Sequence, residues 1–497
     1  MSRGRRRGRS WRDADDLRQR CCVAPSPALR ERIQERLRGM RSAPPINLGG
    51  RIVVEPQKRP GFNDGLILPG SEYPLGTSLR VVRRAAGDRP PLRGLVRVII
   101  VLVEFSDAPM GTTPAHFRDL FFSTGTIPSG SVREYFAEVS HGLLTLTGEV
   151  VGPYRLPRTL AAYAGGQSGT DNPEPNARTM ARDAAARANA DVDFGPYDND
   201  GNGFVDAFIV VHAGAGAEET GSTGDIWSHK WVFSGGPFNA DGTNIFGYLT
   251  IPENSKIGVC AHELGHLIFG WPDLYDTDGS SEGVGNWCLM GGGSWNGNGD
   301  TPAHPSAWCK ANQGWVSVVN RTSNGVVTVR DVEHSHRVYR LWKNGAAGKE
   351  YFLVEHRKRA KFDRLLPGEG LLVYHVDEAI DGNEDERHPF IKVLEADGRD
   401  QLQNGVNRGD EGDPYPGSSG NDALTHTSNP STKSYGDLDS FVTVTNITTG
   451  ARGIRARMTV VGPAGPTAPS VGSRRSRGKK KRVRKASRAS AVRSRRR

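Results

Sequence analysis

The stretch His262-Glu263-Leu264-Gly265-His266 gives the clearest indication of the fold of this 497-residue chain. It lies in an apolar run from Lys256 to Phe269 with helical periodicity, and Gly270 and Pro272 then end the predicted helix. Histidines four residues apart project from one face of a helix, so both imidazoles can bind one Zn²⁺ ion. Glu263 can then accept a proton from a water whose pKa the metal has lowered. The stretch predicts His262 and His266 as zinc ligands and Glu263 as the general base.

A third zinc ligand has to come from the turn that follows this helix. Asp273 is the predicted ligand, and Asp276 and Asp278 are the alternatives. Further along, Met290 is followed directly by three glycines. A methionine in a tight glycine turn beneath the zinc is typical of the metzincin peptidases, so we predict that Met290 forms this structural Met-turn. The alternative interpretations are two surface histidines on an ordinary helix and a methionine that only fills the core.

Further stretches carry motifs of one known family. They are Val101–Asp107, Ser131–Phe136, Asp198–Asp206, His212–Gly214 with Glu219, Ile226–His229, Pro305–Trp315, Glu350–Glu355 and Asn407–Asp410. Over about residues 60–460, the chain resembles the immune inhibitor A-like metallopeptidases, a secreted bacterial family. The resemblance implies a zinc-dependent endopeptidase that acts on proteins or peptides, with calcium support.

Two features depart from the expected pattern. In metzincins a glycine is three residues, and the third ligand six residues, after the second histidine. Here Gly270 and Asp273 are four and seven residues after His266, so the turn contains one added residue. In addition, no apolar run follows the basic start from Arg3 to Arg9, so no secretory signal peptide is visible. The expected extracellular location therefore rests on the resemblance alone.

The segment from Asp198 to Asp206 predicts a calcium site. Oxygen donors occupy its relative positions 1, 3, 5, 7 and 9 and glycine occupies position 6, as in the first nine positions of an EF-hand. Position 12 is Ile209, so another carboxylate has to complete the site, either Glu219 or Glu218. The predicted ligands are Asp198, Asp200, Asn202, the carbonyl of Phe204, Asp206 and Glu219. The alternative is an Asx-rich turn. A second acidic loop, residues 410–413, is better interpreted as a solvated turn.

Apolar runs and turn residues predict an α+β protein. A metzincin-like α/β catalytic domain is expected over residues 93–318. Its predicted strands are Leu95–Phe105, Leu143–Val151 and Phe204–His212, and its predicted helices are Ser131–Val139, Asn176–Ala190 and Lys256–Phe269. A β-rich, sandwich-like domain is expected over residues 319–462. Its predicted strands are Val326–Val332, Val338–Trp342, Glu350–Glu355, Gly370–Val376, Phe441–Ile447 and Ile454–Val461.

Positive charge is concentrated at the two ends of the chain. Residues 1–60 contain 16 basic and 6 acidic residues, and residues 474–497 contain 14 basic and no acidic residues. Between them lie 35 basic and 49 acidic residues, so the body is acidic although the chain has a net charge of +10. We predict a basic arm and pro-segment-like lead-in over residues 1–92 and a disordered basic tail over residues 463–497, which could contact polyanions or a cell surface.

The N-terminal arm contains two features of interest. Leu29, Ile33 and Leu37 have helical spacing, but a solvated arm is the favoured interpretation. A pro-segment thiolate from Cys21-Cys22 could cap the open zinc position, although the acidic and glycine neighbours that usually fix such a switch are not recognisable. Cys288 and Cys309 could pair or remain as buried thiols.

The leading hypothesis is thus an active zinc metalloendopeptidase. One alternative is a degenerate module of the same fold that binds metals without turnover, but the intact His262, Glu263 and His266 argue against it. A nucleic-acid-associated protein that works through its basic ends is a second alternative, and the acidic body argues against that. No apolar stretch approaches the length of a membrane span.

Overall fold

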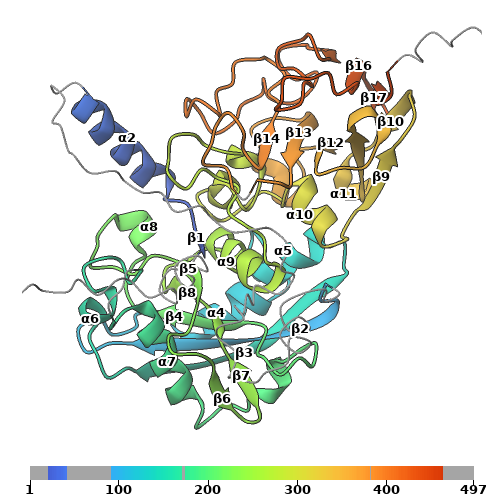
Figure 1. Cartoon of the computed structure of the whole chain (residues 1–497). Coiled ribbons are helices and arrows are strands. Elements are labelled where there is room, and N and C mark those ends of the chain that lie inside the picture. Colours follow the sequence, from blue (N-terminus) through green and yellow to red (C-terminus); the bar gives the residue numbers. More distant parts are fainter. Residues whose placement is uncertain (1–20, 42–90, 171–173, 381, 463–497) are drawn as a thin grey trace, which may run out of the picture. The chain divides into compact units, whose positions relative to one another are not determined.

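The computed structural model describes residues 21–41, 91–170, 174–380 and 382–462. These residues combine helices with a six-stranded, a five-stranded and a four-stranded sheet and the two-stranded ribbon β6 (Phe238–Ala240) and β7 (Thr243–Ile245) (Figure 1). The α+β class predicted from the sequence is therefore confirmed, whereas the division into domains at residue 318 stays a prediction. No helix in the described ranges is long and apolar enough to cross a membrane.

The six-stranded sheet carries the predicted site and has the order β1-β5-β8-β4-β2-β3. Its strands are β1 (Cys21–Cys22), β2 (Gly94–Glu104), β3 (Leu144–Arg155), β4 (Phe208–His212), β5 (His229–Val232) and β8 (Gly247–Pro252). β2, β3, β4 and β8 run parallel to one another. β5 is antiparallel to β8, and β1 is antiparallel to β5.

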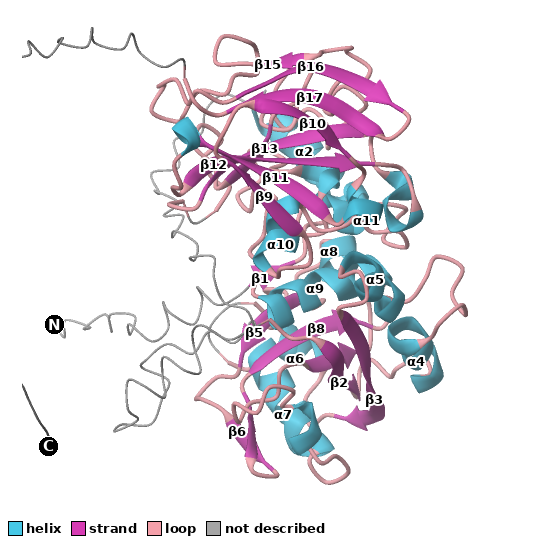
Figure 2. Cartoon of the chain, turned by 90° about the vertical axis from the view of Figure 1, so that its right-hand side faces the viewer, coloured by secondary structure: helices cyan, strands magenta, loops and turns pink. Residues whose placement is uncertain are grey.

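Helices cover both faces of this sheet because its central strands β2, β4 and β8 are apolar on both faces (Figure 2). Successive residues of β2 alternate between two cores: Val98 and Ile100 pack on the side of α5 and α9, and Ile99 and Val101 on the side of α7. The helices of this half are α4 (Pro114–Phe122), α5 (Val132–Val139), α6 (Leu160–Ala164), α7 (Ala177–Ala188), α8 (Ala217–Thr220) and α9 (Ile257–Phe269).

The remaining strands form two sheets that share one apolar core, as expected for a sandwich-like arrangement. The five-stranded sheet consists of β9 (Ser317–Arg321), β11 (Arg337–Trp342), β12 (Glu350–Arg357), β13 (Gly370–Asp377) and β14 (Ile391–Val393). The four-stranded sheet consists of β10 (Gly325–Val329), β15 (Ala423–Leu424), β16 (Thr443–Gly450) and β17 (Gly453–Thr459). The short helices α10 (Ala307–Asn312) and α11 (Val332–Ser335) flank them.

Three details correct the sequence-based predictions. The chain becomes a strand only at Phe208, because the preceding residues belong to the acidic loop. The strand predicted to reach Val332 ends at Val329, where Asp331 caps α11 instead. The N-terminal segment is not a solvated arm: it forms α2 (Pro27–Arg41), and Leu29 is buried. The predicted basic tail lies outside the described residues.

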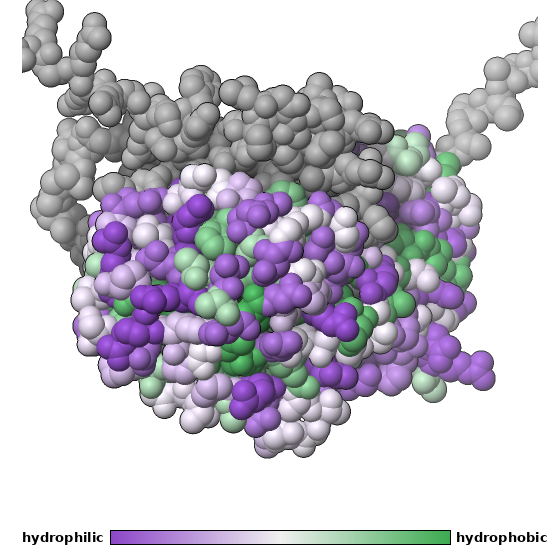
Figure 3. Space-filling model, turned by 90° about the horizontal axis from the view of Figure 1, so that it is seen from below, coloured by the Kyte–Doolittle hydropathy of each residue, from purple (hydrophilic) through white to green (hydrophobic). Residues whose placement is uncertain are grey.

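The face of the molecule seen from below shows mainly hydrophilic residues with small hydrophobic patches between them (Figure 3). Large apolar side chains are instead concentrated in the three cores. The sheet and helix that carry the predicted site are thus held in a well-packed scaffold.

Candidate metal centre and active site

His262, Glu263 and His266 lie on α9, whose residues are all buried. The helix ends at Gly270, which has a left-handed backbone with φ of 64°. In this conformation the Gly270 N–H donates to the carbonyls of Gly265 and His266 and closes the last turn. The chain therefore turns immediately after the helix, which brings Asp273 back to the histidines.

Three side-chain atoms converge at this point. Nε2 of His262 lies 3.0 Å from Nε2 of His266, and Oδ1 of Asp273 lies 3.1 Å from both nitrogens. Nδ1 of His262 faces the Leu289 carbonyl at 2.9 Å, and Nδ1 of His266 faces the Trp271 carbonyl at 2.6 Å. When each Nδ1–H donates to its carbonyl, both Nε2 atoms present lone pairs to one shared point.

This donor set fits a zinc ion. Tetrahedral zinc with ligands at about 2.0–2.1 Å places neighbouring ligand atoms roughly 3.3 Å apart, close to the observed spacing. Burial opposes ionisation of Asp273, but His266 and His262 outweigh it and lower the pKa of this carboxyl to about 2. Two imidazoles and an ionised carboxylate are thus available to the metal.

The two alternative aspartates lie elsewhere in the turn. The Asp276 carboxylate accepts hydrogen bonds from the Ser280 hydroxyl at 2.9 Å and the Ser281 N–H at 2.8 Å. Asp278 accepts from the Ser280 N–H, and both aspartates group with Glu386. Although the turn contains one added residue, the geometry therefore favours Asp273 over Asp276 and Asp278 as the third zinc ligand.

Glu263 is fully buried, and neither of its carboxylate oxygens has a hydrogen-bond partner within the described part of the chain. Burial raises the pKa of Glu263 well above its usual range, because a carboxylate loses its hydration there. Buried polar groups are normally satisfied, so a carboxylate without a protein partner beside a metal centre suits contact with a water molecule.

Met290 packs beneath the zinc helix, where a Met-turn would be expected. A Cβ atom added to Gly265 would lie 2.7 Å from the Met290 sulfur. The Met290 carbonyl accepts a hydrogen bond from the Leu274 N–H, and the preceding carbonyl, of Leu289, orients His262. This turn therefore supports both the helix and the segment that carries Asp273.

The Asp198 loop brings part of the predicted calcium set together. Carboxylate oxygens of Asp198, Asp200 and Asp206 lie within 4.8 Å of one another. Asn202 stays in the loop, but its side-chain oxygen accepts a hydrogen bond from the Phe204 N–H at 2.7 Å.

The predicted completing carboxylate does not join this cluster. Glu219 belongs to none of the metal-like groups among the described residues, and its Oε1 accepts from Asn254 at 3.2 Å. Glu218 is buried and accepts instead from the hydroxyl and N–H of Ser228. Within the described residues, the carboxylate cluster of this loop therefore consists of Asp198, Asp200 and Asp206.

The second acidic loop, residues 410–413, is not a solvated turn throughout, because Asp413 is fully buried. Its carboxylate accepts from the Trp287 indole at 2.7 Å and from the Asp410 N–H at 3.1 Å. Burial raises the pKa of Asp413 to about 7. This aspartate ties the loop to the segment that leads into Met290.

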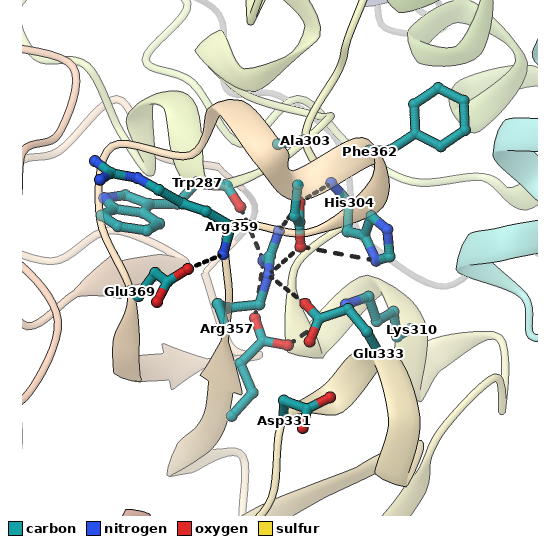
Figure 4. Close-up of polar contacts among 12 residues, drawn as sticks. Trp287, Ala303, His304, Lys310, Asp331, Glu333, Arg357, Arg359, Phe362 and Glu369 are labelled. Carbon is teal, nitrogen blue, oxygen red and sulfur yellow. Dashed lines mark hydrogen bonds and ion pairs between the residues drawn. The ribbon is translucent and has the colours of Figure 1, made fainter. Parts of the chain in front are cut away.

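His304, Glu333 and Asp363 form another buried group with metal-like spacing. A cation of the protein already occupies it: Arg357 donates to both oxygens of Asp363, at 2.7 and 2.6 Å, and lies 3.9 Å from Glu333 (Figure 4). Arg357 also donates to the Trp287 carbonyl at 3.1 Å. Because the charge is balanced internally, we interpret this group as a structural ion cluster that connects β12 to the Met290 segment.

All five cysteines lie in described residues, and none forms a disulfide. Cys288 and Cys309 are adjacent: the Ser306 N–H donates to the Cys288 sulfur, and the Ser306 hydroxyl donates to the Cys309 sulfur. Of the two interpretations of these cysteines, a disulfide or buried thiols, the structure shows buried thiols.

Three aromatic residues whose role the sequence did not indicate bind the N-terminal segment. Tyr275, Trp227 and Trp295 each donate a hydrogen bond to the backbone of residues 22–24, which lie beside the predicted zinc ligands. Tyr275 stands two residues after Asp273, which is the one local signal that could have indicated it. The two tryptophans are brought in from other parts of the fold.

One segment of the chain is similar to known metallopeptidases. Residues 96–319 match the family described as immune inhibitor A peptidase M6, catalytic domain. Over 268 residues the chain is 31% identical to the pre-pro-metalloprotease PrtV of Vibrio cholerae serotype O1 (strain M66-2), which covers 43% of this chain and 29% of that protein. Over 204 residues it is 35% identical to immune inhibitor A of Bacillus thuringiensis subsp. alesti. This match covers 34% of this chain and 30% of that protein.

The chain thus matches less than a third of the length of each of these curated relatives. The matched segment nevertheless contains the zinc helix, the following turn and Met290. Residues 96–319 are thus similar to the catalytic domain of the immune inhibitor A peptidases of family M6.

Proposed function

We propose that the protein is a zinc-dependent endopeptidase that hydrolyses peptide bonds within proteins. The observation that carries the proposal is the convergence of His262, His266 and Asp273, whose donor atoms lie within 3.1 Å of one another. The buried carboxylate of Glu263, next to the first of these ligands, has no hydrogen-bond partner among the described residues. A metal-binding module without turnover would have no use for such a carboxylate.

The residues divide the chemistry between them. A zinc ion held by His262, His266 and Asp273 would supply a Lewis acid that lowers the pKa of a water and polarises the peptide carbonyl. Glu263 accepts the proton of the attacking water and delivers a proton to the leaving amine nitrogen. The carbonyls of Leu289 and Trp271 keep the two imidazoles in the required tautomer.

We further propose that Tyr275 stabilises charge on the substrate carbonyl. Its hydroxyl donates to the Cys22 carbonyl at 2.8 Å, which shows that it can reach a peptide carbonyl in the cleft. A substrate carbonyl in the same place would receive the same hydrogen bond. Donors aimed at a developing oxyanion are among the strongest contributors to acyl-transfer catalysis.

Two further proposals concern the surroundings of the catalytic centre. The cluster of Asp198, Asp200 and Asp206 binds a Ca²⁺ ion, since three carboxylates this close repel one another without a cation. The protein acts outside the cell, as its resemblance to the immune inhibitor A-like peptidases implies, and its basic C-terminal residues contact polyanions.

The decisive experiment combines metal analysis with a protease assay. We expect about one zinc per chain in the purified protein. In protein from which residues 1–41 have been removed, we expect casein hydrolysis that stops when a chelator removes the metal and recovers when zinc is added back. A protein that binds zinc in this site but cleaves neither casein nor peptides, after removal of residues 1–41, would support the binding-module alternative.

A further inference from the structure

Residues 21–30 lie in the cleft beside the predicted zinc ligands. Cys21 and Cys22 form β1, which pairs antiparallel with the edge strand β5, Cys21 opposite Lys230 and Cys22 opposite His229. The Val23 N–H continues the ladder by donating to the Ser228 carbonyl. The segment therefore adds to the sheet as an extended peptide would.

The cleft binds the main chain of this segment at three consecutive carbonyls. Tyr275 donates to the carbonyl of Cys22, Trp227 to that of Val23 and Trp295 to that of Ala24, each at 2.8 Å. Backbone contacts of this kind do not depend on the side chains of the bound peptide. The segment thus occupies groups that a substrate would use.

Side chains further along fasten the segment in place. Val23 is fully buried, and Leu29 is nearly so. Leu29 packs against Gly221, where an added Cβ would lie 2.7 Å from the Leu29 side chain. The Arg30 guanidinium donates to Glu282 and to the Ser281 carbonyl, both at 2.7 Å, in a largely buried ion pair. A charge pair of this kind, desolvated on both sides, fixes the register of the segment.

This register places the sulfur of Cys21 at the metal centre. Sγ of Cys21 lies within 4.8 Å of the ligand atoms of His266 and Asp273. The two histidines and the aspartate leave one position of a tetrahedral zinc ion open. Cys22 does not compete for it, because successive side chains of a strand point to opposite faces.

We propose that the Cys21 thiolate is the fourth zinc ligand and that residues 21–30 hold the enzyme latent by filling its own substrate cleft. This rests on the proposed zinc peptidase function. With the thiolate in the fourth position, no water can enter beside Glu263, and no peptide can pair with β5. Activity then requires that the segment leave the cleft, for example after proteolytic cleavage beyond Arg30.

The test compares Cys21→Ser with the matched control Cys22→Ser in the full-length chain loaded with Co²⁺ in place of zinc. Thiolate ligation to Co²⁺ produces an intense charge-transfer absorption in the near ultraviolet. We expect this band in the parent and in C22S and its loss in C21S. A band of unchanged intensity in C21S would overturn the proposal.

A second measurement uses the unmodified zinc-loaded chain and needs no variant. Iodoacetamide alkylates a thiolate by forming a C–S bond and releasing iodide, and peptide mapping reports each cysteine separately. Alkylation of Cys21 should become at least about tenfold faster when a chelator removes the zinc, whereas Cys22 serves as the internal reference. Equal rates at Cys21 with and without zinc would contradict ligation.

Peptide hydrolysis tests the blocking role. We expect zinc-loaded C21S to cleave a fluorogenic peptide at least about tenfold faster than the parent and C22S, because the segment is held less tightly. Loss of the cobalt band without faster cleavage would overturn latency through the thiolate. A parent protein that binds neither zinc nor cobalt would instead refute the proposed function itself, which keeps the two failures distinguishable.

Discussion

The sulfur of Met290 lies in the space that Gly265 leaves open on the zinc helix. A Cβ at residue 265 would stand 2.7 Å from this sulfur and 3.1 Å from the Trp271 ring. Gly265 is the residue directly before the second zinc histidine, so the close packing beneath the helix and the position of the ligand are coupled.

Gly265→Ala should therefore destabilise the protein even though alanine favours helix. We expect a loss of roughly 1–3 kcal/mol from overpacking, partly offset by about 1 kcal/mol of helix propensity. In a Met290→Ala background the contact with the sulfur is gone and only the tight approach to the Trp271 ring is left, so the same change should cost less or become neutral. Thermal unfolding of the four proteins in this double-mutant cycle checks this coupling, and additive effects would contradict it.

Glu263→Gln should separate metal binding from catalysis. The amide keeps the shape of the side chain but cannot accept the proton of the attacking water. We expect a near-stoichiometric zinc content, an unchanged melting temperature and peptide cleavage at least roughly a hundredfold slower. The assay requires a chain whose residues 21–30 have been released from the cleft. Loss of zinc would show that Glu263 has a structural role instead.

Asp273→Ala should strip zinc from the protein, because Asp273 is the aspartate of this turn that lies 3.1 Å from both histidine nitrogens. Asp276→Ala and Asp278→Ala are the matched controls, since their carboxylates bond to Ser280 instead. Zinc per chain, measured after dialysis against a weak chelator, should fall severalfold only in the first variant. A larger loss in either control would reassign the ligand.

Removal of Ca²⁺ should lower the melting temperature through the Asp198 loop. A ligand present at a hundred times its Kd stabilises the folded state by about 2.7 kcal/mol, so a shift of a few degrees is expected. The experiment is best done in the Glu263→Gln background, with free zinc restored, to exclude self-cleavage and zinc loss. An Asp198→Asn/Asp200→Asn variant should show no shift, and an unchanged parent curve would exclude the site.

Glu218 should make stability depend on pH. Burial raises its pKa from the ordinary value of 4.5 to about 7, so between these values the folded state binds a proton that the unfolded state has released. Stability should therefore fall as the pH rises through this range, by up to about 3 kcal/mol. Glu218→Gln should flatten this slope, whereas the exposed Asp119→Asn should not. Equal slopes for parent and E218Q would refute the shift.

Local sequence patterns predicted the elements that carry the site. The run from Leu95 to Phe105 is apolar at every core position and forms β2, and the helix predicted over Lys256 to Phe269 is α9. The spacing of His262 and His266 depends only on helix geometry, so their convergence could be predicted without knowing the fold.

Contacts between distant segments could not be predicted in the same way. Trp227 and the Val23 carbonyl that it binds are 204 residues apart, and Tyr275 and Cys22 are 253 residues apart. Cys21 could be suspected of capping the zinc because it is a thiol in the N-terminal arm. Nothing in the neighbouring sequence, however, indicates that it pairs as a strand with β5. The prediction that Glu219 completes the calcium cluster was wrong for the same reason, because its carboxylate accepts a hydrogen bond from Asn254, 35 residues further along the chain.

The antiparallel edge strand β5 has a consequence for the molecule as a whole. An uncovered sheet edge presents unpaired N–H and C=O groups and invites pairing with other chains, which leads to self-association. Here the short strand of Cys21 and Cys22 covers that edge. We therefore expect that this pairing also limits self-association, and that a chain without its N-terminal strand associates with other chains more readily than the full chain does.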